Sequence, residues 1–126
     1  MSEFYLKEAI KDWDKRELVK FCLFCCYKVK HSMNEESLRA VELVEKWLED
    51  KSSVSQEELE KAAYYTTYNC NADVAAHDTF RAAYRNINII HWTDNVVFYI
   101  ASAINSSIEA LYIDYMRDKS SNIMEG

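Results

Sequence analysis

Apolar residues recur along this chain at intervals of three and four, the spacing that places side chains on one face of an α-helix. The segment 14–31 is apolar nearly all round between residues 21 and 27, which is typical of a buried helix. Asp14, with Glu17 three residues later, has the form of an N-terminal cap. We therefore predict a central helix over 14–31, with this inward face: Leu18, Cys22, Cys25 and Val29.

The segment 35–50 has the regular pattern of a helix with one buried side. Its apolar stripe is Leu38, Val41, Val44 and Leu48, with Ala40 and Trp47 beside it. The opposite face is charged: Glu42, Glu45, Lys46, Glu49 and Asp50. Glu35 and Glu36 fall in the first turn, where negative charge complements the helix dipole. The break at 32–34 therefore ends one helix and precedes the next.

Four further helices follow from the same signals. We predict helices over 3–10, capped by Ser2, over 55–70, over 72–86 or somewhat beyond, and over 94–117, capped by Thr93 or Asp94. Ser55 and Glu58 form a capping box for the second of these. The predicted inward residues are Leu59, Ala62, Ala63 and Thr66, then Ala72, Ala76, Ala83 and Ile87, and finally Val97, Ala101, Ile104, Ile108, Leu111 and Tyr115.

Composition agrees with an all-helical fold. The chain has no proline and one glycine, its last residue, whereas a β-rich domain needs tight turns that usually demand glycine. Left-handed caps would come from asparagine: Asn34, Asn71, Asn86 and Asn88. With 126 residues, 49% of them hydrophobic, the chain has material for one core. We predict an all-α, compact single-domain bundle of five to six helices over 1–118, and a flexible tail over 119–126.

The net charge and the cysteines indicate which cellular compartment and which classes of binding partner suit this chain. A net charge of −6 disfavours nucleic-acid binding, which usually leaves a basic footprint. The N-terminus has no signal-peptide pattern, and the longest apolar run, 21–27, is too short to cross a bilayer. The four cysteines, Cys22, Cys25, Cys26 and Cys70, suit a reducing cytosol better than a disulfide framework. We expect a cytoplasmic protein that binds neither nucleic acid nor membrane.

No motif in the chain indicates catalysis. Cys22-x-x-Cys25-Cys26 lies in the middle of a predicted helix, whereas a redox pair sits at a helix N-terminus. A structural zinc site would need a second pair, and only Cys70 remains. There is also no GxSxG, glycine-rich phosphate loop or HExxH. We therefore predict core cysteines, no catalytic residues, no metal and no cofactor.

The clearest candidate for binding is an acidic surface. Between residues 35 and 60 nine acidic residues occur with three basic ones, whereas 11–30 is comparatively basic. An acidic helical face can steer and hold a basic protein partner, although such a face can also be merely solvated. The predicted partner-binding residues are Glu42, Glu45, Glu49, Asp50, Glu57 and Glu58.

A rival reading is a pocket between the fourth and fifth predicted helices for a small anionic or nucleotide-like ligand. Polar residues recur at helical spacing from Asp73 to His91, provided that the fifth helix continues through 86–88. Tyrosines lie beside this stripe, but a half-buried helix interface or a homo-oligomer contact explains the same pattern. The residues of this rival are Tyr64, Tyr68, His77, Arg81, Tyr84, Arg85 and His91.

Two stretches, LRAVELVEKWLED and EELEKAAYYTTYNCNADVAAHDTFRAAY, resemble Imm-5-like immunity proteins and similar alanine-rich helical phage proteins. The matching positions are Cys25 or Cys26, Arg39-Ala40, Glu45, Trp47, Ala62-Ala63, Ala75-Ala76-His77 and Ala82-Ala83. The resemblance implies a small cytosolic protein that neutralises a protein partner. That partner would be a toxin or, if a phage encodes the chain, a component of host defence.

Overall fold

The structure, a computed structural model, describes residues 3–64, 69–85 and 87–125, with the backbone alone at 51, 56, 63, 64 and 122–125. These residues form seven α-helices and contain no strand. The predicted all-α bundle is thus confirmed, but the number of helices is seven rather than five to six. They are α1 (Leu6–Ala9), α2 (Lys15–Tyr27), α3 (Glu35–Glu49), α4 (Gln56–Tyr64), α5 (Asn71–Tyr84), α6 (Ile89–Ala103) and α7 (Ile108–Glu125).

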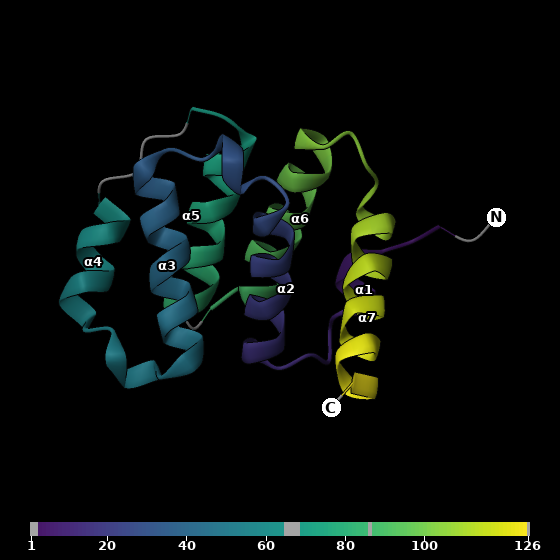
Figure 1. The fold of residues 1–126 in the computed structure, drawn as a ribbon, viewed down its shortest axis with the longest axis horizontal. Coiled ribbons are helices and arrows are strands. Elements are labelled where there is room, and N and C mark those ends of the chain that lie inside the picture. The colour runs from purple at the N-terminus through teal and green to yellow at the C-terminus, as the bar shows by residue number, and fades with distance from the viewer. Residues whose placement is uncertain (1–2, 65–68, 86, 126) are drawn as a thin grey trace.

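Four of these helices, α2, α3, α5 and α6, pack against one another as the centre of the bundle (Figure 1). The short helix α4 lies outside them against α3 and α5, while α1 and α7 cover the opposite side (Figure 1). Short 3-10 turns at Lys30–Ser32 and Lys51–Ser53 connect the helices on either side of α3. The arrangement leaves α3 and α4 exposed along one edge.

Helix α2 is the central helix that the apolar pattern predicts. The Asp14 side chain accepts a hydrogen bond from the Glu17 N–H at 2.8 Å, as the capping signal indicates. The predicted inward face, from Leu18 to Val29, is buried. The helix ends at Tyr27 instead of near His31, because the chain tightens into the 3-10 turn that leads to α3.

The three cysteines of α2 are core residues, as predicted. Cys22, Cys25 and Cys26 are completely buried. Burial raises the pKa of the Cys22 and Cys26 thiols to about 12, so both stay protonated and unreactive near neutral pH. Among the described residues no cluster of metal-ligating side chains occurs.

Side-chain caps also mark the starts of α3 and α4. The Ser55 cap is the predicted one, whereas Asn34, expected as a left-handed cap, has an extended backbone (φ −78°) and caps α3 with its side chain. The Asn34 side chain accepts from the Ser37 N–H at 2.8 Å, and the Glu58 N–H donates to Ser55 Oγ at 3.1 Å. The first helix is shorter than predicted, since α1 begins at Leu6 instead of residue 3.

The predicted final helix is wrong in both its start and its continuity. Helix α6 already begins at Ile89, and Thr93 lies buried inside it with its hydroxyl donating to the Ile89 carbonyl at 2.9 Å. Asn105 then adopts a left-handed conformation (φ 54°) and ends this helix. Ser107 caps α7 by accepting from the Ala110 N–H at 3.0 Å. Helix α7 extends to Glu125, so the predicted tail begins within it.

Two predicted inward residues are exposed as a result of these breaks. Ile104 follows the end of α6 and is 37% exposed. Ile87 follows the end of α5 and is 67% exposed. Asn88, directly before the start of α6, adopts a left-handed conformation (φ 55°), as predicted for an asparagine cap.

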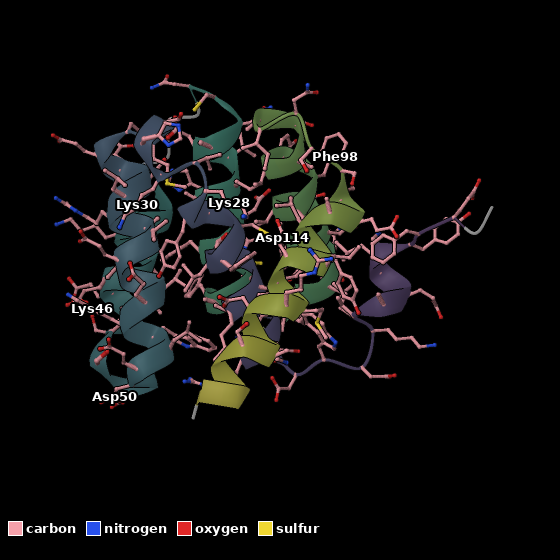
Figure 2. All side chains as sticks on the ribbon, turned by 45° about the vertical axis from the view of Figure 1, so that its right-hand side comes forward. Lys28, Lys30, Lys46, Asp50, Phe98 and Asp114 are labelled. Carbon is pink, nitrogen blue, oxygen red and sulfur yellow. The ribbon has the colours of Figure 1, made fainter. Side chains whose placement is uncertain are left out.

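Aromatic packing fastens α7 to α2. Phe21 of α2 lies with its ring centroid 4.9 Å from that of Tyr115, whose hydroxyl donates to Glu17 Oε2 at 2.6 Å. Burial and the adjacent Glu17 carboxylate raise the pKa of Tyr115. Asp114 of α7 pairs with Lys28 of α2 at 3.6 Å on the surface (Figure 2).

Within the described residues no single helix has both the length and the apolar character needed to span a bilayer. Helix α6 and residues 108–121 of α7 meet that test only as a pair, bent by 106° at the break between them.

Candidate functional site

A groove of about 520 Å³ runs along the α3–α4 edge. One stripe of α3 forms its first wall: Glu35, Glu36, Arg39, Glu42, Leu43 and Lys46. Helix α4 supplies the second wall with Glu58, Lys61 and Ala62. The groove thus has an apolar floor between Leu43 and Ala62 and charged rims. We call this feature the α3–α4 groove.

The charges on its rims are available to another molecule. Glu36 aside, the charged side chains of the α3–α4 groove form no ion pair with another described residue. Those on the outer rim, among them Glu42, Lys46 and Glu58, are exposed. With Lys61 of α4 included, residues 35–61 carry nine acidic and four basic groups, a net charge of −5 against −6 for the whole chain. The negative charge of the protein is therefore concentrated at this edge.

The structure divides the six predicted partner-binding residues among different surroundings. Glu42 and Glu58 line the α3–α4 groove, whereas Glu45, Glu49, Asp50 and Glu57 do not. Asp50 accepts hydrogen bonds from the backbone N–H and hydroxyl of Ser52 at 3.0 and 2.7 Å, and these lower its pKa. Glu49 and Glu57 are exposed outside the groove.

Glu45 lies beside Tyr27 of α2 and does not line the groove. Partial burial, followed by the Glu45 charge and hydrogen bond, raises the pKa of Tyr27 to about 12. Glu45 is half-buried in this position. It therefore contributes to the acidic edge from a different face than Glu42 and Glu58.

Asp73, near the start of α5, is a buried carboxylate that accepts hydrogen bonds from the start of α3. Asp73 Oδ1 accepts from the Asn34 N–H at 2.9 Å and the Ser37 hydroxyl at 2.6 Å, while Oδ2 accepts from the Asn69 N–H at 3.2 Å. The Cys70 thiol adds a weaker contact at 3.6 Å. Burial would raise the pKa of Asp73, but these hydrogen bonds outweigh it and lower the pKa. Asp73 thereby ties the start of α3 to the segment before α5.

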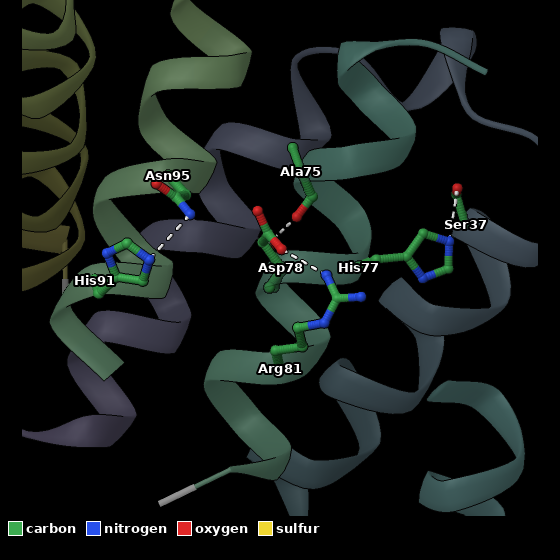
Figure 3. Close-up of polar contacts among 8 residues, drawn as sticks. Ser37, Ala75, His77, Asp78, Arg81, His91 and Asn95 are labelled. Atoms are coloured by element: carbon green, nitrogen blue, oxygen red, sulfur yellow. Dashed lines mark hydrogen bonds and ion pairs between the residues drawn. The ribbon is translucent and has the colours of Figure 1, made fainter. Parts of the chain in front are cut away.

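His77 lies one turn further along α5 and faces the same interface. Its Nε2 is 3.5 Å from the Ser37 hydroxyl, on the side of α5 that faces α3 (Figure 3). The side chain is 1% exposed. Burial and the Arg81 charge lower its pKa, against the opposing effects of Asp73 and Glu36. His77 is therefore a neutral interface residue near pH 7.

The lowered pKa of His77 predicts a pH dependence of stability. In the unfolded chain a histidine has a pKa of about 6.5. As the pH falls, the unfolded chain therefore takes up this proton at a higher pH than the folded chain does. The unfolded state then binds more protons, so the free energy of unfolding should fall as the pH drops below about 6.5. Chemical unfolding between pH 5 and 8 measures this slope. His77→Gln should reduce this slope of the free energy of unfolding against pH. An equal slope in the native chain and in His77→Gln would contradict the assignment.

The residues of the predicted ligand pocket do not share one helical face. Helix α5 ends at Tyr84, so His91 belongs to α6, where it contacts Asn95 (Figure 3). His77 faces α3, whereas Arg81 pairs with Asp78 at 2.7 Å (Figure 3). Tyr68 and the side chain of Tyr64 lie outside the described residues. The predicted polar stripe from Asp73 to His91 required one helix through residues 86–88, but α5 ends at Tyr84 and α6 begins at Ile89.

Sequence reasoning missed the basic residues of the groove. Arg39, Lys46 and Lys61 alternate with the acids along its walls. The sequence does contain a signal for two of these basic residues. A glutamate is followed four residues later by a basic residue at Glu35–Arg39 and at Glu42–Lys46, and this spacing places both side chains on one helix face.

In comparisons with known proteins, no protein family, no curated sequence and no solved structure matches this chain.

Proposed function

We propose that this chain is a small non-enzymatic inhibitor or immunity-type protein that neutralises a protein partner. The partner presents a basic surface, and the α3–α4 groove receives it. The observation that carries the proposal is the net charge of −5 on residues 35–61, at an edge that also holds a groove with exposed charged side chains on its rims.

The mixed charge of the groove favours a specific partner over any cation. Acidic residues in excess attract a basic surface and raise the rate of encounter. Arg39, Lys46 and Lys61 repel a uniformly basic partner and accept one whose acids lie between its basic groups. The apolar floor at Leu43 and Ala62 offers a place for an apolar anchor, the kind of contact that contributes most to affinity.

Charge reversal within the groove tests the proposal. The tagged chain and its Glu42→Lys/Glu58→Lys variant would be used to capture proteins from the native host, or from that host under phage attack, at near-physiological salt. We expect one basic partner whose capture by the variant falls at least about tenfold, since two opposed charges become two like charges. The purified pair should then bind more weakly as salt is raised.

The matched control reverses two exposed acids elsewhere, in an Asp12→Lys/Glu109→Lys variant of identical net charge. It should retain the partner. A second pair, Glu45→Lys/Glu49→Lys, reports how far the interface extends beyond the groove. Capture that fails with the native chain, or that falls equally in the groove variant and the control variant, would refute the proposed function.

A further inference from the structure

The outer face of α3 carries charges that alternate in sign along the helix. Four charged residues follow one another at intervals of four, three and four: Glu35, Arg39, Glu42 and Lys46. With about 3.6 residues per turn, these intervals place the side chains in one stripe along about 16 Å of helix. All four are exposed, whereas Val41 and Val44, on the opposite side of α3, are buried in the core. This α3 stripe therefore points away from the bundle.

The α3 stripe is complementary to itself. Its charges run negative, positive, negative, positive, and its intervals read the same in both directions. A two-fold axis that sets a second copy antiparallel against it brings Glu35 of one copy opposite Lys46 of the other. The same axis brings Arg39 opposite Glu42, and it repeats both contacts. Four pairs of opposite charge thus form, and no like charges meet within the stripe.

Forming these pairs does not require existing ion pairs to break. Within the part of the chain that the structure describes, the four side chains of the α3 stripe make no ion pair. They also lie beside an apolar surface, because the half-buried Leu43 and Ala62 form the floor of the α3–α4 groove. The two-fold axis keeps α4 of both copies on the same side of the two α3 helices, so the two floors meet. Burial of both floors adds free energy of association that exposed ion pairs alone supply only weakly.

We propose that the chain associates with a second copy of itself through the α3 stripe and the α3–α4 groove. Charge complementarity identifies the occupant, because a two-fold contact needs a surface that matches itself. Two chains of net charge −6 also repel each other, so the dimer is weak and forms at high protein concentration. The second copy covers the groove, so a protein partner of the kind proposed above has to displace it.

Sedimentation equilibrium of the purified chain at near-physiological salt tests the dimer. Such salt screens the repulsion between the two chains beyond about 8 Å and screens the close contacts much less. We expect a monomer–dimer equilibrium for the native chain. Arg39→Glu and Glu42→Arg should each dimerise at least about tenfold more weakly, since each places like charges at two of the four contacts. A mixture of these two variants should associate at least as tightly as the native chain, because every contact then joins opposite charges.

Matched controls change the net charge by the same amounts at exposed positions outside α3, in Asp12→Arg and Arg117→Glu. Each control should dimerise as the native chain does. A native chain that stays monomeric at every concentration would overturn the proposal. So would equal weakening in the controls, or a mixture of Arg39→Glu and Glu42→Arg that associates no better than either alone. Failure to capture a partner from the native host would refute the proposed function and would leave this dimer in place, because dimerisation is measured on the purified chain.

Discussion

Replacing Phe21 by alanine is expected to lower the free energy of unfolding by about 3 to 5 kcal/mol. Phe21 is completely buried, and its ring contacts Trp13, Tyr112 and Tyr115 at centroid distances of 5.7, 6.5 and 4.9 Å. Truncation removes the side chain that joins α2 to α7 and leaves a cavity that these large rings cannot close without moving. Urea unfolding followed by far-UV circular dichroism measures the loss.

Phe98→Ala provides the matched control on a neighbouring helix. Phe98 is 53% exposed on α6 (Figure 2). The same truncation should therefore change the free energy of unfolding by no more than about 0.5 kcal/mol. Losses of equal size in the two variants would show that α2 is not the centre of the core.

Replacing Asp73 by alanine is expected to cost about 3 to 5 kcal/mol, a large effect for a polar residue. The substitution leaves the buried Ser37 hydroxyl and the Asn34 and Asn69 N–H groups without the carboxylate that accepts from them. Each donor that stays buried then lacks a hydrogen bond, which costs free energy in the folded state. Asp73→Asn, which keeps one acceptor oxygen, should cost less, and Asp12→Ala at an exposed site should cost no more than about 0.5 kcal/mol.

The pH dependence of the Asp73 effect has a defined sign. Because the folded state lowers the pKa of Asp73, the carboxylate contributes its full stability above the unfolded value near 3.9. That contribution is lost as the pH falls through the lower folded pKa. The difference between the native chain and Asp73→Ala should thus be constant from pH 5 to 8 and shrink in stronger acid. A difference that shrinks near neutral pH would contradict the lowered pKa.

Local signals were sufficient for those parts of the fold in which the backbone and one nearby side chain decide the outcome. Asp14 and Ser55 each cap a helix as their sequence context predicts. The inward face of α2 was also correct, since a helix apolar on all sides can be stable only when other helices surround it.

The break between α6 and α7 could not be predicted from periodicity. Apolar spacing continues through Ile104 to Ile108, so a single long helix satisfied the pattern. The break depends on Asn105, whose left-handed conformation has a weaker sequence signal than glycine would have. Thr93 was misread because a threonine within a helix can satisfy its hydroxyl on the preceding turn, as it does on the Ile89 carbonyl.

The acidic edge was predictable from composition, whereas the groove was not. Its shape depends on how α4 packs beside α3, a tertiary contact that brings Glu58 and Lys61 opposite Glu42 and Lys46.

The most direct test of the central claim is site-specific photo-crosslinking in the native cells. A photoreactive phenylalanine analogue would replace Lys61, which lines the α3–α4 groove, and in a second protein Ser102, which is exposed on α6. If the groove receives a protein partner, irradiation should yield one covalent adduct of defined mass from the Lys61 position and none from the Ser102 position. No adduct from Lys61, or equal adducts from both positions, would contradict the account.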